Sequence, residues 1–263
     1  MFVENRGTQL FVTSFGTGTR TALGLGGWIG GGELWLPVLG LLSRKWRTAT
    51  FDQRGSGTSH VPKAQDISGD AWVDDVFVVM DALGIERCLL LSDSSGCFPA
   101  VLAAAKRPER FEGLAIVGGA PRMPLDLERR LFAIGLRVAS RPLLKEFARR
   151  CLPEDNSGQV RRWLWDICVR SEPRDAARLM RVIDGFDLTA AAATISVPTL
   201  VVHGTRDYIV PLSRAQELAA LIPNSEMVVM EGAGHVPMMS SPEAVVSIIE
   251  KWLAERAAET EQS

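Results

Sequence analysis

Ser94 stands at the junction between an apolar run and a segment of helical periodicity. Small residues lie two positions before it (Ser92) and two positions after it (Gly96). This spacing is that of a nucleophile elbow, G-x-S-x-G, with serine in place of the first glycine. The tight turn raises the central hydroxyl above a sheet and sets it at a helix N-terminus, where the helix dipole favours a developing oxyanion. For this segment alone, an ordinary Ser/Asp cap of a helix is the simpler alternative.

Two later segments each place one reactive side chain just past an apolar run. The run at residues 199–202 precedes a loop that contains Asp207, and the run at 226–230 precedes a loop that contains His235. Taken alone, the aspartate is typical of a turn and the histidine of a solvated loop. Together with Ser94 they place a hydroxyl, a carboxylate and an imidazole after three strands, at the edge where open parallel sheets bind ligands. The sequence therefore predicts a Ser94–His235–Asp207 triad.

These residues require a sheet whose strands end at one edge. Short apolar runs bounded by glycine alternate along the chain with longer segments of helical period. Because the runs are apolar throughout, they predict parallel strands buried on both faces, and hence an α/β fold with a doubly wound, mostly parallel sheet. The expected strands are residues 21–25, 47–51, 88–91, 113–117, 199–202 and 226–230, with an edge hairpin that includes 9–14. The expected helices are residues 33–42, 69–83, 96–106, 213–221 and 242–256.

The alternation of strands and helices stops between residues 122 and 195. This stretch is rich in arginine, lacks a convincing strand and shows helical patterns at 127–138 and 160–169. We interpret 122–195 as a helical lid, inserted into a core made of 1–121 and 196–263 and lying over the carboxyl ends of the strands. Its arginines are offset by nearby acids and are interpreted as a solvated face and not as an anion site. The polar tail after residue 256 is expected to fray.

The motifs around the three residues resemble those of the α/β-hydrolase-fold superfamily, over about residues 5–256. Besides the elbow, the chain shows Asp-Gln-Arg-Gly-Ser-Gly-Thr-Ser beginning at Asp52, similar to the D-x-R-G-x-G-x-S signature of that superfamily. The patterns H-G-x-x-D-x-x-V-P around Asp207 and G-x-G-H-x-P around His235 also match. The first motif is structural in the family, and we assign it no catalytic role.

The resemblance implies roles for five residues. Ser94 would be the nucleophile, His235 the general base and Asp207 the group that orients the imidazole, in the chain order Ser…Asp…His of this architecture. The backbone N–H groups of Trp28 and Ser95 would form the oxyanion hole.

The chain departs from the family pattern at three positions. Gly26 stands where a histidine is usual in the oxyanion loop, and this leaves the rigidity of that loop open. Ser92 replaces the first glycine of the elbow. Asp93 stands where histidine is common, and its carboxylate either changes the pKa of the base, disfavours anionic substrates or faces away from the site.

The resemblance is barely specific for substrate. The leading interpretation is a serine hydrolase that cleaves a carboxylic ester or lactone of a small, apolar molecule through an acyl-enzyme. The alternatives are a carbon–carbon bond hydrolase of ring-fission diketones, a cofactor-free oxygenase, or a non-enzymatic ligand receptor on the same fold. Among the aromatic side chains, Trp28 and Trp163 are expected to bind substrate, although packing of the lid onto the sheet is an equally simple role for them.

Composition narrows the class of partner. The 263 residues are 46% hydrophobic and 23% charged, which excludes disorder and fibrous repeats. A formal charge of −2 gives no overall field that would attract nucleic acid or an anionic membrane. We find no apolar run of the length of a membrane span and no secretory signal, so we expect a small-molecule partner and a cytoplasmic protein. The oligomeric state stays open.

Neither a metal nor a cofactor is expected. His60, His203 and His235 never cluster with cysteine at ligand spacing, and His203 is interpreted as structural. The glycine-rich segment at 24–32 fails the register of G-x-G-x-x-G, because position 29 is isoleucine and position 35 is tryptophan. Four cysteines in a chain of this length do not form a disulfide framework, which agrees with a reducing compartment.

Overall fold

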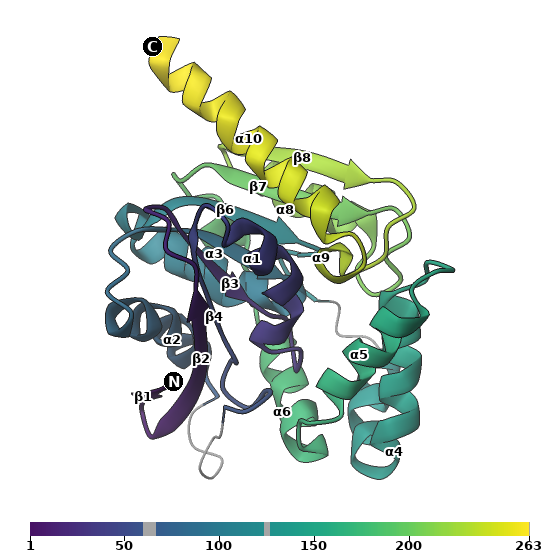
Figure 1. Cartoon of the computed structure of the whole chain (residues 1–263). Coiled ribbons are helices and arrows are strands. Elements are labelled where there is room, and N and C mark those ends of the chain that lie inside the picture. The colour runs from purple at the N-terminus through teal and green to yellow at the C-terminus, as the bar shows by residue number, and fades with distance from the viewer. Residues whose placement is uncertain (60–66, 124–126, 263) are drawn as a thin grey trace.

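The computed structural model describes residues 1–59, 67–123 and 127–262, so His60 lies outside the described residues. An eight-stranded sheet of order β1-β2-β4-β3-β5-β6-β7-β8 runs through the molecule (Figure 1). From β4 to β8 the neighbouring strands are parallel, whereas β1 and β2 form an antiparallel hairpin at one edge. The strands are β1 (Phe2–Asn5), β2 (Thr8–Phe15), β3 (Thr21–Leu25), β4 (Arg47–Phe51), β5 (Cys88–Asp93), β6 (Phe111–Val117), β7 (Thr199–Gly204) and β8 (Ser225–Met230).

Helices cover both faces of this sheet, which explains why β3, β5 and β7 are buried along their whole length. Helix α1 contacts α10 on one face; α2 contacts α3, and α7 contacts both α3 and α8, on the other (Figure 1). The predicted doubly wound α/β fold is confirmed. The helices are α1 (Leu36–Leu42), α2 (Gly69–Ala82), α3 (Cys97–Lys106), α7 (Thr189–Ala192), α8 (Leu212–Leu221), α9 (Pro237–Ser240) and α10 (Pro242–Gln262).

The register of the parallel strands brings the predicted site together. Asp93 at the end of β5 pairs with Val117 of β6, which in turn pairs with Val202 of β7. Gly204 at the end of β7 pairs with Met230 of β8. The loops that follow β5, β7 and β8 therefore leave the sheet at one edge, and these loops carry Ser94, Asp207 and His235.

A helical insertion separates β6 from β7 (Figure 1). It consists of α4 (Leu127–Cys151), α5 (Gly158–Cys168) and α6 (Pro173–Ile183). Helix α4 is broken at Ala139, whose backbone angles are φ −140° and ψ 51°. The helix predicted over 127–138 ends at this break, but the second half of α4 and the whole of α6 were not predicted. Pro173 occupies the first turn of α6, where a missing N–H costs nothing.

Two further expectations are corrected or refined. Helix α10 continues to Gln262 instead of fraying after residue 256, because its last two turns are rich in the good helix formers Ala and Glu. The end of this helix extends beyond the body of the molecule (Figure 1). The D-x-R-G motif is structural: Arg54 forms a buried ion pair with Asp75 at 2.6 Å, and Asp52 accepts from the backbone N–H groups of Gly32 (2.9 Å) and Thr58 (2.6 Å).

None of the helices within the described ranges combines the length and the apolar character that a bilayer crossing requires.

Candidate active site

Ser94 sits on a strained turn between β5 and α3. Its backbone φ is +48°, a left-handed conformation that residues other than glycine rarely adopt. A Cβ at Gly96 would lie 2.7 Å from the carbonyl oxygen of Leu25, so only glycine fits two positions after the serine. Ser92, in the position of the first elbow glycine, is fully buried. The predicted strand–turn–helix is therefore present, and its tightness is what exposes the Ser94 side chain.

Asp207 and His235 are in direct contact. Their loops follow β7 and β8, and His235 Nδ1 lies 2.7 Å from Asp207 Oδ2. The other carboxylate oxygen of Asp207 accepts hydrogen bonds from the backbone N–H groups of Ile209 and Val210, both at 2.8 Å. A Cβ at Gly118, just after β6, would lie 3.1 Å from His235 Nδ1, so this glycine leaves room for the imidazole.

Burial opposes charge on both members of this pair. For Asp207, burial raises the pKa, but the charge and hydrogen bond of His235 outweigh it, and the pKa lies below its ordinary value. For His235, burial lowers the pKa, but the Asp207 carboxylate and its hydrogen bond, helped by the charge of Asp93, raise it above its ordinary value. The pair therefore favours an imidazolium beside a carboxylate, which is the state reached when a general base accepts a proton.

The loop after β3 is held against the elbow by two hydrogen bonds. The N–H of Gly27 donates to Asp93 Oδ2 at 3.1 Å, and the N–H of Trp28 donates to Ser95 Oγ at 2.6 Å. Trp28 has a positive φ of 29°, so this loop is strained as well. A Cβ at Gly26 would collide with the carbonyl oxygen of Gly31, which gives a steric reason for glycine where the family usually has histidine.

Asp93 is buried and does not belong to the cavity wall. Its carboxyl is 1% exposed, and Oδ1 has no hydrogen-bond partner within the described parts of the chain. Burial raises the pKa of Asp93 to about 7, against the opposing effects of the His235 charge and the Gly27 N–H. Of the three possibilities left open for this departure, a carboxylate turned away from the cavity agrees with this position, and its charge still raises the pKa of His235.

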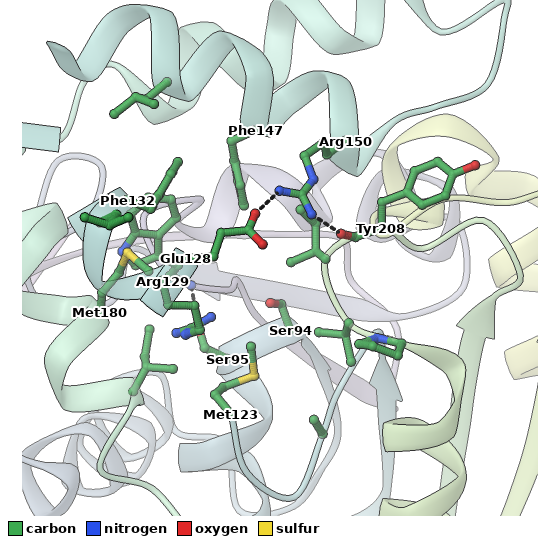
Figure 2. Close-up of a pocket in the computed structure, with 18 of the residues that line it drawn as sticks. Ser94, Ser95, Met123, Glu128, Arg129, Phe132, Phe147, Arg150, Met180 and Tyr208 are labelled. Carbon is green, nitrogen blue, oxygen red and sulfur yellow. Dashed lines mark hydrogen bonds and ion pairs between the residues drawn. The ribbon is translucent and has the colours of Figure 1, made fainter. Parts of the chain in front are cut away.

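A cavity of about 730 Å³ opens above Ser94, between the sheet edge and the insertion (Figure 2). Figure 2 shows Ser94 below side chains that project from α4. The wall is mainly apolar, as expected for an ester or lactone pocket. Its principal apolar members are Trp28, Met123, Phe132, Phe147, Met180 and Ile183.

Four arginines also line the cavity, and each of them is paired with an acid. Arg129 and Arg150, interpreted from the sequence as part of a solvated face, also line the cavity, and Arg150 is 41% exposed. Arg150 also donates to the carbonyl oxygen of Tyr208 at 3.0 Å (Figure 2). The pairs are Arg122–Glu217 (3.0 Å), Arg129–Asp184 (2.7 Å), Arg150–Glu128 (2.7 Å) and Arg214–Glu217 (2.8 Å).

Comparison with known proteins agrees with this geometry. The sequence model of the Alpha/beta hydrolase family matches residues 23–248. The chain belongs to the alpha/beta hydrolase family.

The proteins that are similar to this alpha/beta hydrolase are named after different hydrolytic reactions. A 2-hydroxymuconate semialdehyde hydrolase from Pseudomonas sp. (strain CF600) is 30% identical over 85% of this chain and 82% of its own. A protein from Caulobacter sp. (strain K31), 28% identical over 89% of this chain and 90% of its own, carries the provisional name carbamate hydrolase RutD. The crystal structure of the enol-lactonase from Burkholderia xenovorans LB400 superposes with a TM-score of 0.88 at 25% identity, covering 97% of this chain and all of that one.

The two tryptophans predicted to bind substrate lie in different places. Trp28 lines the cavity of this alpha/beta hydrolase, and its indole N–H donates to the carbonyl oxygen of Ala176 at 2.9 Å. Trp163, predicted to bind substrate, is not in the cavity wall; its indole N–H donates to Glu33 at 2.6 Å, so it ties the insertion to the core. His203 is buried beside Asp207, and its Nε2 lies 2.9 Å from the carbonyl oxygen of Val210.

Several residues of the cavity wall were not predicted from the sequence. Met123 lies in the loop after β6, and Met180 lies on α6, which the sequence did not predict as a helix. Their apolar type alone gave no signal, because the same residue types fill the core. Within the described residues no three metal-ligating side chains gather at one place.

Proposed function

We propose that this alpha/beta hydrolase cleaves a carboxylic ester or lactone through an acyl-enzyme on Ser94, with His235 as general base and Asp207 as the residue that orients it. The observation that carries the proposal is the 2.7 Å contact between His235 and Asp207 at the sheet edge that presents Ser94 to an apolar cavity. The likeness to an enol-lactonase supports cleavage of the bond between a carbonyl carbon and oxygen.

The reaction follows from the roles of these groups. His235 takes the proton of the Ser94 hydroxyl as its oxygen attacks the carbonyl carbon, and Asp207 stabilises the imidazolium that results. The tetrahedral intermediate collapses as His235 returns this proton to the leaving oxygen, which leaves an acyl group on Ser94. Water, deprotonated by His235, then attacks the acyl carbon, and His235 returns this proton to the Ser94 oxygen as the acid is released. In a lactone, the leaving alcohol remains attached to the acyl group.

The oxyanion hole is proposed to consist of the backbone N–H groups of Trp28 and Ser95. Each such donor is worth about 10²–10³ in rate. The N–H of Trp28 is already engaged by Ser95 Oγ, so this hydroxyl must turn aside when the oxyanion forms.

We propose further that α4, α5 and α6, within residues 122–195, act as a lid domain on a core of 1–121 and 196–263, whereas α7 at the end of this range packs against α3 and α8 of the core. The two parts are in contact at the proposed oxyanion loop. The indole N–H of Trp28 donates a hydrogen bond to the carbonyl oxygen of Ala176 on α6, and its ring packs edge-on against Phe147 of α4, with the ring centres 5.2 Å apart. A lid in contact with the oxyanion loop would exclude water from the acyl-enzyme.

The cavity favours an uncharged acyl or alcohol group. Its wall is mainly apolar, and each of its four arginines is paired with an acid, although Arg122 and Arg214 share Glu217. A substrate carboxylate that bound Arg129 or Arg150 would have to displace Asp184 or Glu128, at the cost of leaving that acid without its partner.

Carbon–carbon bond hydrolysis is the second candidate. The 30% identity to a 2-hydroxymuconate semialdehyde hydrolase favours it, and the same serine, histidine and aspartate would serve that reaction.

A substrate panel distinguishes the two candidates. The purified chain is assayed with short aryl esters, lactones of several ring sizes and diketones of the ring-fission type. We expect the highest kcat/KM with an ester or lactone of an apolar acid. Turnover of diketones alone would favour the second candidate, and failure to turn over any of the three classes would favour an oxygenase or a receptor.

A serine-directed phosphonate tests the nucleophile. We expect it to label Ser94 in the wild-type protein and in the Ser95→Ala variant, which lacks only the hydroxyl of the neighbouring residue. Ser94→Ala should lose both labelling and ester turnover while keeping the wild-type melting temperature. Ester turnover that survives in Ser94→Ala would exclude the acyl-enzyme scheme.

A further inference from the structure

The first half of α4 has one face that is both apolar and exposed. Four aliphatic residues follow at spacings of four, three and four positions, which places them on a single line along the helix. We call this line the apolar stripe. Contiguous exposed apolar surface of this kind marks a binding surface more often than single exposed residues do. The stripe consists of Leu127 (70% exposed), Leu131 (58%), Ile134 (62%) and Val138 (86%).

Positive charge borders the stripe. Helix α4 contains seven basic and two acidic residues, in a chain whose formal charge is −2. Arg130 and Arg137 are seven positions apart, so they lie on the same flank of the stripe. Neither forms an ion pair with any residue in the described ranges, whereas Arg129, Arg149 and Arg150 of the same helix do. Two exposed guanidinium groups therefore remain available to an anionic partner.

The stripe is continuous with the mouth of the cavity. Leu127 and Leu131 line the cavity as well as the outer surface. Helix α4 lies at the periphery of the molecule, on the side away from β1 and β2 (Figure 1). A surface that covers the stripe would therefore also cover the entrance through which substrate reaches Ser94.

Two protein occupants fit less well. A second copy of this chain, packed antiparallel on the stripe about a two-fold axis, would bring Arg130 and Arg137 against the same arginines of its partner. An acidic protein would need a groove that matches a single convex helix with projecting aliphatic side chains. A lipid surface needs no such shape: aliphatic side chains enter the boundary of the acyl chains while arginines stay at the headgroups.

We propose that the apolar stripe of α4 docks on an anionic lipid surface, with Arg130 and Arg137 at the headgroups. From the near-neutral charge of the whole chain, the sequence predicts no membrane partner. A net charge summed over 263 residues, however, conceals one strongly basic helix. The cavity entrance would then face the lipid. This inference does not depend on the proposed function, since docking requires no turnover.

Cosedimentation with vesicles tests the proposal. We expect the full chain to bind vesicles of equal parts phosphatidylglycerol and phosphatidylcholine, to bind phosphatidylcholine vesicles far less, and to be released by salt. Arg130→Gln and Arg137→Gln should each lower the partition coefficient by about fivefold. Ile134→Ser and Val138→Ser should each lower it by about tenfold. None of these four residues lines the cavity and all four are exposed, so we expect each variant to keep the wild-type melting temperature, which reports that it is folded.

Matched controls lie outside α4. Val229→Ser on β8 removes an exposed aliphatic residue, and Arg44→Gln removes an exposed arginine; both should bind vesicles like the wild type. Failure of the wild-type chain to bind either vesicle overturns the proposal and leaves an acidic protein as the occupant. Binding that the controls reduce as much as the α4 variants also overturns it. So does a dimer that Ile134→Ser dissociates in sedimentation velocity, because a second copy would then cover the stripe.

Discussion

The backbone N–H of Trp28 donates to the hydroxyl oxygen of Ser95 at 2.6 Å. Each of these residues contributes its backbone N–H to the proposed oxyanion hole, so the Ser95 side chain occupies the donor of Trp28. The hydroxyl holds the strained Trp28 loop in place, but it also competes with the carbonyl oxygen of a substrate for the same N–H. This competition should lower the rate of the chemical step, so the effect of the Ser95 side chain can be measured in kcat.

Removing the Ser95 hydroxyl should therefore speed the reaction. In Ser95→Ala the Trp28 N–H is free to bind the oxyanion, and a net hydrogen bond of about 1 kcal/mol no longer has to be broken. We expect kcat for a short aryl ester to rise about fivefold. A fall of tenfold or more, with an unchanged melting temperature, would show instead that the hydroxyl itself donates to the oxyanion.

The pH dependence of turnover should report the raised pKa of His235. The base acts only when its imidazole is neutral, and the carboxylates of Asp207 and Asp93 keep it protonated to higher pH. We expect kcat/KM to rise with pH through an inflection above 6.5, the ordinary pKa of histidine. Asp93→Asn removes one of the two negative charges, so the inflection should move to lower pH. An inflection that Asp93→Asn leaves in place would show that Asp93 has no electrostatic effect on the base.

The same buried carboxyl should lower stability at alkaline pH. The pKa of Asp93 in the folded protein is raised to about 7, whereas an exposed aspartate titrates near 4. Between these values the folded state holds a proton that the unfolded chain has released, so stability falls as pH rises through this window. Asp93→Asn keeps an oxygen that can accept from the Gly27 N–H and removes this titration. We expect its melting temperature to exceed that of the wild type by about 5 °C at pH 8 and by less at pH 5. A difference that is the same at both values would contradict the raised pKa.

The size of the acyl pocket should depend on Phe147. Its ring packs edge-on against Trp28 and lies within 6.3 Å of the Phe132 ring, centre to centre. Phe147→Ala enlarges an apolar cavity that already holds about 730 Å³, so we expect the preferred acyl chain of an ester series to lengthen. As a comparison, Phe11→Ala removes a ring from the β1–β2 hairpin and should leave the chain-length preference unchanged.

The sheet and the triad loops were predictable because their signals are local. Buried parallel strands read as continuous apolar runs, and the elbow around Ser94 needs small residues at fixed positions. His235 and Asp207 follow two such runs, so topology alone carries them to one edge. Their hydrogen bond, by contrast, depends on loop conformation and became visible only in the structure.

The insertion was less predictable, because its helices face both a cavity and solvent. In α4 the aliphatic residues of the stripe point outward while Leu136 and Leu144 are buried, so the apolar residues do not form the single inward face that a sequence pattern reveals. Trp163 shows the same limit: its type suggested a pocket, but Glu33, 130 positions earlier, fixes its indole outside the cavity wall. No spacing in the sequence indicates such a contact.

The loop that carries His235 is tied to the insertion at two points. The N–H of His235 donates to the carbonyl oxygen of Cys151 at 2.8 Å, at the end of α4. The N–H of Gly234 donates to Glu154 Oε1 at 2.8 Å, and the Ser240 hydroxyl reaches the same oxygen at 3.2 Å. Glu154 therefore positions the loop of the proposed base from outside the site.

Loss of this acceptor should slow the chemical step without changing its pH dependence. In Glu154→Ala the Gly234 N–H loses its partner, and a small displacement of the His235 loop is expected to reduce kcat about tenfold with little change in KM. Glu154→Gln keeps an oxygen acceptor and should retain most of the activity, which separates the hydrogen bond from the charge. Steady-state kinetics across pH measures both variants: an equal loss in Glu154→Gln, or a shifted inflection in either, would mean that Glu154 acts through its charge and not by holding the loop.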